Sequence, residues 1–568
     1  MIATPASERY EVPTGARPSA TVVLLRDGPA GLETLMLVRG EHGEHDMRSG
    51  AAVFPGGVLD ARDREAHALC VGGDDAAYSA RFGFPAGGLD YAVAALRETF
   101  EEVGLLLACR PDGSAVDIAA LAADLHPWRD PLNRGEVGIA ALCREFGLCL
   151  DLRGLLYTGH WLTPPGMPKR WDARFFTTRA PAGQVAVADG GEAQSLLWVQ
   201  PQWALQPDSG LKLLPAMRHT LGELTPHADT EAVLRSMAVR TQVPRHMPRR
   251  GRTSAGLRIV LPTELAYAEV GRLDPEGRGD VLVELRHGTP VRLSPNLWRV
   301  TAPNPGPMTG PGTNSYLVGA GEEWTVIDPG PADPVHLQAL LDAAAAAGGR
   351  ITRILATHTH RDHSPGAMPL AAATGAPVWG RIAAHADWQD SSFEPVHQPV
   401  HGETMDCAPG VQLRVLHTPG HASNHLCFLL TEASGERLLF TGDHVMQGST
   451  VVINPPDGDM RVYLASLKAL LDEPLDWLAP GHGFLVAQPH DVLRALIAHR
   501  LKREAKVAAV LAGVGPATID CLLPQVYDDV PTALHGVARR SLLAHLLKLQ
   551  QEGAAQCHAE RWHGVAAA

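Results

Sequence analysis

One short segment of the chain carries four side chains of the types that bind metal ions. In "ATHTHRDHSPG" (356–366), His358, His360, Asp362 and His363 lie within six residues. Because an extended backbone directs residues i and i+2 to the same side, His358 and His360 would present their imidazoles together. Zinc takes imidazole nitrogens and carboxylate oxygens as ligands. The segment therefore predicts a zinc-like site, and the alternative is a solvated loop in a chain that has 27 histidines.

A second cluster, far upstream, consists of carboxylates. In "RETFEEVG" (97–104), Glu98, Glu101 and Glu102 fall at i, i+3 and i+4, which places them on one face of a helix that Gly104 would end. Carboxylate oxygens suit hard cations such as Mg²⁺. The cluster predicts a magnesium-binding helix, and the alternative is an acidic amphipathic helix that faces solvent.

The elements that position these clusters belong to more than one domain. At 568 residues the chain exceeds what one hydrophobic core supports, and roughly three or four domains are expected. Two β-rich runs, 19–28 and 33–40, precede the carboxylate helix. Between 314 and 482, strands that end in His or Asp recur, as in sites built from loops at one edge of a layered α/β sheet. The C-terminal region has helical periodicity at 490–511, 517–527 and 532–552.

The histidine cluster resembles the signature of a known family. "HTHRDH" matches the His-x-His-x-Asp-His signature of the metallo-β-lactamase superfamily, and "VIDPG", "TPGH", "FTGDH" and "APGHG" resemble its other motifs. The resemblance implies two zinc ions, held by His358, His360 and His421 on one side, by Asp362, His363 and His482 on the other, and by Asp443 as the bridge. It also implies catalysis at Asp362, a steadying role for Asp328, and a contact from His425 to a substrate oxyanion. The alternative for His425 is a packed polar residue.

A pair of zinc ions would share a water, lower its pKa toward ~7 and stabilise charge on the group that the water attacks. Such a site hydrolyses phosphodiesters, thioesters or lactams, and its ligands do not choose among them. The segments 304–319, 499–504 and 526–553 resemble the β-lactamase-like protein 2 subgroup, which ends in a winged-helix-like domain. That subgroup includes endoribonucleases that prefer single strands, which implies single-stranded RNA as a partner.

The C-terminal region offers a modest basic face for such a partner, formed by Lys502, Arg503, Lys506, Arg539, Arg540 and Lys548. An ordinary solvated helix surface explains the same residues, and no aromatic residues are interleaved with them. The alternative function is that of a glyoxalase-II-like thioesterase, in which "TPGHASNH" (418–425) occurs in similar form.

The carboxylate cluster resembles the second half of the Nudix box, and "FPGG" (54–57), which contains Gly57, resembles its start. The resemblance implies Mg²⁺ or Mn²⁺ at Glu98, Glu101 and Glu102, which would polarise a diphosphate for attack by water. Arg97 would brace the turn. The implied substrate is a small molecule linked through a nucleoside diphosphate, and the alternative is a binding module without activity.

Two features depart from the Nudix pattern. Gly57 and Arg97 are 40 positions apart, which is 26 more than the family's usual spacing, and the usual glutamate of the box is replaced by the shorter Asp63. Such insertions occur in the Nudix subgroup that resembles the peroxisomal coenzyme A diphosphatase, and "HWLTPPGMPKRWDARFF" (160–176) is similar to that subgroup. Glu192 is a weaker candidate for a further ligand or base.

The composition limits the partners and the location. The net charge of −13 means that binding to nucleic acid depends on a local basic patch, for which "RHMPRRGR" (245–252) is a candidate and a solvated linker the alternative. The eight scattered cysteines are predicted to be reduced thiols. The N-terminus lacks the pattern of a signal peptide and no run suits a membrane span, so a soluble cytoplasmic protein is expected.

These observations predict an α/β multidomain hydrolase. A Nudix-like α/β/α sandwich at 17–225 would be followed by a domain tail and linker at 226–289, a metallo-β-lactamase-like αββα sandwich at 290–489 and a winged-helix-like domain at 490–568. RNA cleavage by the zinc site is the favoured function. The alternative couples thioester hydrolysis to coenzyme A cleavage. The oligomeric state is not readable from the sequence.

Overall fold

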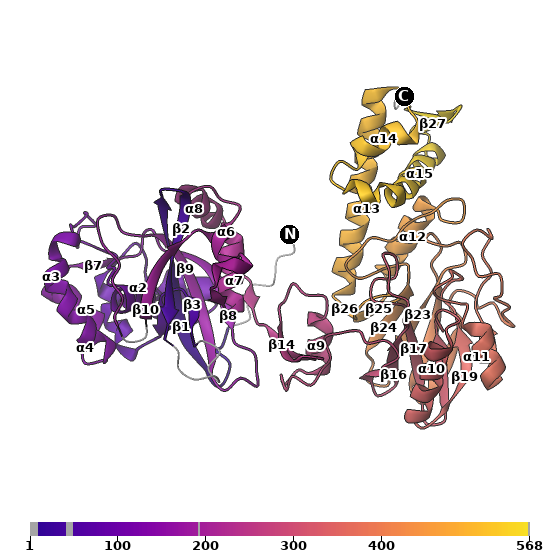
Figure 1. Cartoon of the computed structure of the whole chain (residues 1–568), viewed down its shortest axis with the longest axis horizontal. Helices are drawn as coiled ribbons and strands as arrows, with labels where there is room; N and C mark the ends of the chain where they lie inside the picture. Colours follow the sequence, from indigo (N-terminus) through magenta and orange to yellow (C-terminus); the bar gives the residue numbers. More distant parts are fainter. Residues whose placement is uncertain (1–9, 41–48, 191–192, 566–568) are drawn as a thin grey trace. The chain divides into compact units, whose positions relative to one another are not determined.

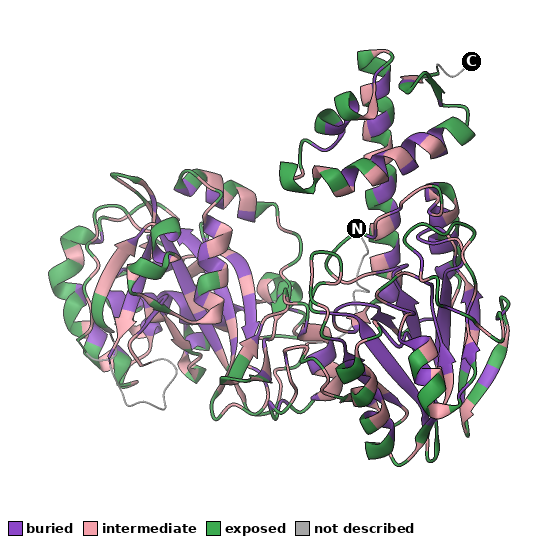
Figure 2. Ribbon diagram, turned by 45° about the vertical axis from the view of Figure 1, so that its right-hand side comes forward, coloured by how far each residue is buried: buried purple, intermediate pink, exposed green. Residues whose placement is uncertain are grey.

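The structure is a computed structural model, and it describes residues 10–40, 49–190 and 193–565. The chain divides into two compact units, residues 1–250 with 276–278 and residues 251–275 with 279–568. Each unit contains its own sheets, and many of the residues in their strands are buried (Figures 1 and 2). All eight cysteines are free thiols, as predicted. Among the described residues, the helices are too short or too polar to cross a membrane.

A nine-stranded mixed sheet forms the centre of the first unit. Its central strand β1 contains the apolar run 22–25, which is completely buried because neighbouring elements cover both faces of the sheet. β1 and β2 pair antiparallel up to Gly28 and Gly31, which confirms the two strands predicted at 19–40. In the order β11-β3-β2-β1-β9-β8-β12, with β10 beside β2 and β4 beside β1, the strands are β1 (Ala16–Gly28), β2 (Gly31–Arg39), β3 (Ala51–Val53), β4 (Gly56–Val58), β8 (Leu156–Leu162), β9 (Arg170–Arg179), β10 (Ala193–Val199), β11 (Lys212–Leu213) and β12 (Arg245–His246).

The helix α2 (Leu89–Val103) packs on this sheet beside β1 and β4. It ends where Gly104 adopts φ 72° and donates its N–H to Phe100 O, so the predicted stop is confirmed. The other helices of the unit are α1 (Asp75–Phe82), α3 (Ala122–Leu125), α4 (Arg129–Asn133), α5 (Ile139–Glu145), α6 (Pro201–Ala204), α7 (Pro215–Leu224) and α8 (Thr230–Ala238), with 3₁₀ segments Ala61–Leu69, Ala119–Leu121, His126–Trp128 and Pro207–Ser209. A small sheet consists of β5 (Cys70–Val71), β7 (Cys149–Asp151) and β6 (Ala108–Cys109).

The second unit contains two six-stranded sheets that pack face to face. The first sheet has the order β15 (Val291–Ser294), β16 (Leu297–Thr301), β17 (Asn314–Ala320), β18 (Glu323–Ile327), β19 (Arg350–Leu355) and β20 (Val378–Trp379). The second has the order β21 (Thr404–Ala408), β22 (Val411–His417), β23 (Leu426–Thr431), β24 (Arg437–Gly442), β25 (Trp477–Pro480) and β26 (Val486–Ala487).

The sequence of β23 shows how the layers form. Leu426, Phe428 and Leu430 enter the core between the two sheets, whereas Cys427 and Leu429 enter the core on the outer face. This follows from the alternation of side chains along a strand, and both faces are apolar because both are covered. The helices α10 (Pro334–Ala346) and α11 (Ala367–Thr374) pack on the outer face of the first sheet, and α12 (Met460–Leu470) and α13 (Pro489–Val514) pack on that of the second. The predicted αββα sandwich is confirmed.

The C-terminal region is joined to this sandwich through the long helix α13. Leu493 and Ile497 belong to the core of the sandwich, whereas Val507 and Leu511 belong to a separate core of the C-terminal elements. Those elements are α14 (Ile519–Val526), a 3₁₀ turn at Thr532–Leu534, α15 (His535–Gln551) and a hairpin of β27 (Ala555–His558) and β28 (Arg561–Gly564). The three helices agree with the predicted helical segments, and the hairpin was not predicted.

The segment 226–289, predicted as a domain tail and linker, is divided between the units. α8 and β12 lie in the first unit, whereas the hairpin of β13 (Arg249–Thr253) and β14 (Gly256–Val260) continues into the second, where α9 (Tyr267–Leu273) lies. Part of the basic patch predicted at 245–252 is occupied within the structure, since Arg250 donates to Gly166 O and Gly277 O at 2.7 and 3.1 Å.

A buried ion pair fastens α9 to the sandwich. Arg299 on β16 donates twice to the Glu269 carboxylate, at 2.7 and 2.8 Å, and both side chains are at most 2% exposed. Glu269 also accepts the N–H of Leu485 at 2.8 Å. The weak periodicity of this stretch conceals α9, a helix of only seven residues that this ion pair and the packing of Tyr267, Val270 and Leu273 hold in place.

We expect Glu269→Gln to destabilise the second unit by about 3–5 kcal/mol, because the Arg299 guanidinium would stay buried without its charged partner. Urea unfolding followed by tryptophan fluorescence measures the change. The exposed pair of Asp491 and Arg494 provides a control, and Asp491→Asn should cost less than about 1 kcal/mol. Equal effects of the two substitutions would contradict this account.

Candidate metal centres

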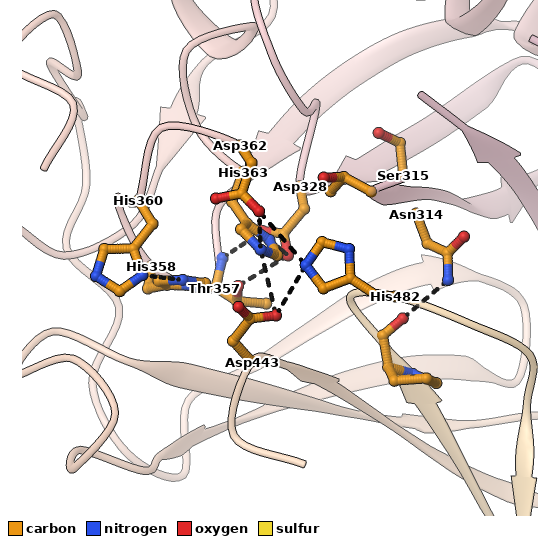
Figure 3. Close-up of polar contacts among 12 residues, drawn as sticks. Asn314, Ser315, Asp328, Thr357, His358, His360, Asp362, His363, Asp443 and His482 are labelled. Carbon is orange, nitrogen blue, oxygen red and sulfur yellow. Dashed lines mark hydrogen bonds and ion pairs between the residues drawn. The ribbon is translucent and has the colours of Figure 1, made fainter. Parts of the chain in front are cut away.

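The seven predicted zinc ligands converge at one edge of the sandwich, and Figure 3 labels all of them except His421. His358, His360, Asp362 and His363 follow β19, His421 follows β22, Asp443 follows β24 and His482 follows β25. β18 runs parallel to β19, and β24 runs parallel to β25, so the carboxyl ends of each pair lie together. The ligand atoms form two groups, and within each group they lie within 4.8 Å of one another.

The first group consists of His358, His360 and His421. His360 Nδ1 lies 3.0 Å from His358 Nε2 and 3.0 Å from His421 Nε2. Burial, together with the neighbouring imidazoles, lowers the pKa of His360 to about 3 and that of His358 well below its ordinary value. His421 Nδ1 lies 2.8 Å from Val452 O, and because a carbonyl only accepts, Nδ1 carries the proton and Nε2 is left as the ligand atom. All three rings are therefore neutral donors of the kind that zinc requires.

The second group combines two imidazoles with two carboxylates, Asp362 and Asp443. His482 Nε2 lies 3.4 Å from Asp362 Oδ2 and 3.3 Å from Asp443 Oδ1, and His363 Nε2 lies at the same two distances. Although burial opposes it, the Asp443 and Asp362 carboxylates raise the pKa of His482 to about 9. Protons on the imidazoles thus balance the buried negative charge, and a bound cation would displace them.

Three atoms at the centre of this group have no hydrogen-bond partner in the structure, namely His363 Nε2, Asp443 Oδ1 and His482 Nε2. Buried polar atoms are rarely left unpaired, and a missing ion is one explanation for such an exception. Asp443 stands between the groups, because its Oδ2 lies 3.8 Å from His421 Nε2 while its Oδ1 faces the second group. This is the position that a bridging ligand requires.

Asp328, which was predicted to steady the site, contacts the histidine segment directly. Its carboxylate accepts the N–H and O–H of Thr357 at 2.7 and 2.8 Å and lies 2.9 Å from His363 Nδ1. Asp328 adopts φ 53°, which is uncommon for a residue with a side chain, and its own N–H bonds to Leu355 O at 2.8 Å. The strained backbone aims the carboxylate at the start of the loop and orients His363.

His425 does not reach a substrate position in the structure. It is completely buried, its Nδ1 lies 3.0 Å from Thr418 Oγ1, and its ring stacks on that of His358 with centroids 5.0 Å apart. Its place behind His358 corresponds to the packed polar residue that was the alternative. The sequence left both positions open, because the spacing of four residues from His421 does not reveal which side of the loop faces inward.

Two residues that position His482 were not singled out from the sequence. Asn314 donates to Pro480 O and Gly483 O at 3.1 and 2.8 Å, so its side chain clamps the loop that carries His482. A Cβ at Gly481 would lie 2.7 Å from His363 Cε1 and 2.9 Å from Asp443 Oδ1, and only glycine allows this close approach. The signal was present, because both residues belong to the motifs "GTNSYLVG" and "APGHG".

The carboxylates of α2 form the second candidate centre. Arg97 Nη1 donates to Glu98 Oε1 and Glu101 Oε2 at 2.8 and 3.0 Å, and Glu102 accepts the N–H of Gly56 at 2.8 Å. Glu101 and Glu102 are only 3% and 5% exposed, so they do not belong to a solvated helix face. Burial raises the pKa of Glu101 to about 7, and its Oε1 has no hydrogen-bond partner. A divalent cation would restore the ionised form and fill the free oxygen.

The structure also accounts for both departures from the Nudix pattern. Despite its short side chain, Asp63 accepts two bonds from Arg97, at 2.7 and 3.2 Å, and Asp63 is buried. The inserted residues form the 3₁₀ segment at Ala61–Leu69 and α1 before the chain enters α2. A Cβ at Gly57 would lie 2.3 Å from the Glu98 carboxyl carbon, so a larger residue there would displace the Glu98 carboxylate. Glu192 lies outside the described residues.

Much of the predicted basic face is neutralised within the C-terminal region. Arg503 pairs with Asp529, Lys506 with Asp528, Arg539 with Asp520, and Lys548 with Glu504 and Glu552. These pairs favour the ordinary helix surface that was the alternative. Lys502 and Arg540 have no acidic partner among the described residues.

Comparison with known proteins finds matching families for both halves of the chain. The family model "Metallo-beta-lactamase superfamily" matches residues 308–482, "Beta-lactamase associated winged helix domain" matches 518–562, and "NUDT19 Nudix domain" matches 79–209. The "Beta-lactamase-like protein 2 homolog" of Caenorhabditis elegans is 31% identical over 271 residues, which cover 47% of this chain and 89% of that protein. The chain belongs to the metallo-β-lactamase superfamily.

Two further similarities complete the comparison. The "Atrochrysone carboxyl ACP thioesterase" of Aspergillus chevalieri is 32% identical over 248 residues, which cover 42% of this chain and 76% of that protein. A solved structure of a Nudix hydrolase from Alicyclobacillus acidocaldarius is 28% identical, covers 39% of this chain and 96% of that chain, and has a TM-score of 0.32. The predicted fusion is confirmed, and the chain is a hydrolase. Both families typically bind divalent metal ions, with which the two groups of ligands agree.

We expect Mg²⁺ to raise the unfolding temperature of the first unit, because a ligand that binds only the folded state stabilises that state. At a hundred times its Kd, Mg²⁺ would add about 2.7 kcal/mol. Glu101→Gln should remove most of this response in scanning calorimetry. Glu136→Gln, at an exposed ion pair of the same unit, should retain it. A full Mg²⁺ response in the Glu101 variant would exclude this carboxylate as a ligand.

Proposed function

We propose that the metallo-β-lactamase domain binds two zinc ions and hydrolyses phosphodiester bonds of single-stranded RNA. The observation that carries this proposal is the division of the ligand atoms into two adjacent groups, with Asp443 between them. The donor set fits the metal, since neutral imidazoles and carboxylates are zinc ligands and three central atoms lack other partners. Two bound ions would supply an activated water and stabilise the negative charge of the attacked phosphate.

The chain's own residues would hold and orient this chemistry. His358, His360 and His421 would hold one ion, and Asp362, His363 and His482 the other. Although burial opposes it, His363 holds the pKa of Asp362 below its ordinary value, so the carboxylate is ionised. With 26% of its side chain exposed, Asp362 is the ligand of this group that we expect to accept a proton, at the carboxylate oxygen that does not hold the ion.

The resemblance of three segments to the β-lactamase-like protein 2 subgroup, which includes endoribonucleases, supports RNA as the substrate, and the "Beta-lactamase-like protein 2 homolog" of Caenorhabditis elegans is matched over 89% of its length. The winged-helix domain also supports RNA as the substrate, because the subgroup that includes single-strand-preferring endoribonucleases ends in such a domain. Thioester hydrolysis is the second candidate, and the relatives named as ACP thioesterases favour it. The cytoplasmic location stays a prediction of the sequence.

For the Nudix domain we propose hydrolysis of a small molecule linked through a nucleoside diphosphate, with Mg²⁺ or Mn²⁺ at Glu98, Glu101 and Glu102. The clustered carboxylates and the unpartnered Glu101 Oε1 support a cation there. The alternative is a binding module that kept the fold without the activity. If the zinc site cleaves thioesters instead, coenzyme A becomes the substrate that would link the two domains.

We expect His360→Ala to lower the zinc content of the purified protein and to abolish hydrolysis by the second unit, because His360 belongs to a group of only three imidazoles. Metal content is measured by mass spectrometry and activity on a fluorescent single-stranded RNA. The exposed His126 provides a control, and His126→Ala should leave both values unchanged. Full zinc content and activity in the His360 variant would refute the ligand assignment.

A parallel assay on single-stranded RNA, a glutathione thioester and coenzyme A distinguishes the candidate functions. We expect RNA cleavage that His360→Ala abolishes and Glu101→Gln leaves intact, together with nucleoside-diphosphate hydrolysis that shows the opposite dependence. Thioester turnover without RNA cleavage would select the second candidate. If Glu101→Gln leaves coenzyme A and other nucleoside-diphosphate substrates hydrolysed at the same rate, the Nudix proposal fails.

A further inference from the structure

An exposed tryptophan stands at the rim of the metal centre. Trp388 is 56% exposed, in the loop between β20 and β21. Its φ of 69° lies in the left-handed region, which a bulky side chain rarely adopts. A strained conformation of this kind persists only where the surroundings enforce it, and such positions cluster at ligand-binding sites.

The contacts that hold the backbone next to Trp388 in place come from the segment that carries four of the predicted zinc ligands. Gln389 forms a β-bridge with His360, and its Oε1 accepts the O–H of Thr359 at 2.6 Å. The N–H of Asp390 donates to Thr359 O, also at 2.6 Å. On its other side Gln389 donates to Asp457 Oδ2 at 3.1 Å. The loop is therefore tied to the backbone between His358 and His360, and Trp388 is held one residue from this bridge.

The C-terminal region contributes a cation to the same place. The guanidinium of Arg540, on α15, lies over the Trp388 ring at 5.1 Å from its centroid. Neighbouring cations such as Arg539 and Arg503 are in ion pairs, but Arg540 has no acidic partner among the described residues. Arg361, between two of the predicted ligands, is exposed and likewise has no acidic partner in the described part of the chain.

We propose that Trp388 and Arg540 bind an unpaired base and its phosphate, and that they direct the next phosphodiester of a single-stranded RNA into the metal centre. This inference rests on the proposed RNA cleavage. The indole offers a flat surface on which any base stacks, and the two unpaired guanidiniums offer charge to the backbone. Arg361 directly follows His360 in the chain, is exposed, and would contact the phosphate that is cleaved.

The charge of the surroundings favours this occupant. The net charge of the chain is −13, yet Arg361 and Arg540 form no ion pair with an acidic side chain among the described residues. A bound phosphate would supply the negative charge that these two guanidiniums lack. Of the acidic residues in the loop, Asp390 is engaged by the hydroxyls of Ser364 and Ser392, at 2.8 and 2.6 Å. Asp387 is exposed, and its negative charge in the same loop works against phosphate binding. An acyl thioester would use the indole but not both guanidiniums.

Binding of a fluorescein-labelled oligouridine to the full chain, measured by anisotropy in the presence of EDTA, tests the site without cleavage. We expect Trp388→Ala to raise the Kd about 10-fold and Trp388→Phe to retain most of the affinity, because stacking needs only an aromatic face. Arg540→Ala should weaken binding and reduce the salt dependence by about one phosphate contact, whereas Arg540→Lys should keep the salt dependence. Trp203→Ala, at a tryptophan of the first unit that is 46% exposed, is the matched control and should bind normally.

The kinetic readout separates this inference from the function on which it rests. With zinc restored, Trp388→Ala should raise KM for RNA and leave the turnover of a glutathione thioester unchanged. If the unaltered chain neither binds nor cleaves RNA, the proposed function itself fails and this site fails with it. If the unaltered chain cleaves RNA and Trp388→Ala binds oligouridine equally well, only this site is refuted. A raised KM for the thioester alone would assign the indole to an acyl substrate and overturn the RNA assignment.

Discussion

Both candidate metal sites contain buried carboxylates, and each buried carboxylate requires a positively charged or hydrogen-bonding partner. An ionised carboxylate inside a protein is costly unless a cation or a set of donors compensates it. In the second unit Asp443 is compensated by His363 and His482, and Asp328 by Thr357 and His363. In the first unit Arg97 compensates Glu98, Glu101 and Asp63 together. In both units the fold brings each of these carboxylates next to its partner and buries the pair.

The two units satisfy this constraint with different partners. A protonated imidazole can lose its proton when it binds a metal ion, so the positive charge of the histidine site can come either from protons or from bound metal ions. Arginine always keeps its charge, so Arg97 braces the carboxylates, while Glu101 keeps one oxygen free. This difference fits a softer ion at the first kind of site and a harder one at the second. The same chain thereby carries two clusters of metal-binding side chains, one in each unit.

Much of the fold and of the metal ligands could be predicted, and the failures share a cause. The β-rich run at 19–28 and the helical spacing in α2 are local patterns, so both elements were recognised. The candidate metal ligands were found in the sequence because each follows a strand in a recurrent motif, and the structure brings them together in two groups. By contrast, Glu269 and Arg299 are 30 residues apart and Asp63 and Arg97 are 34 apart, and a pair of charges leaves no periodic trace. The basic face of the C-terminal region was overestimated, because its acidic partners are distant in sequence.

The sequence by itself determined which chemistry is available, because residue type and motif spacing decide which ions can be held and which strands and helices form. Only the tertiary structure decided which of these groups face one another. It placed His425 behind His358, gathered seven ligands into two groups, and brought Arg540 over Trp388 from a different part of the chain. The physical reason is that the burial, the charge partners and the direction of a side chain depend on residues that are far away in the sequence. A local sequence pattern contains no information about these residues.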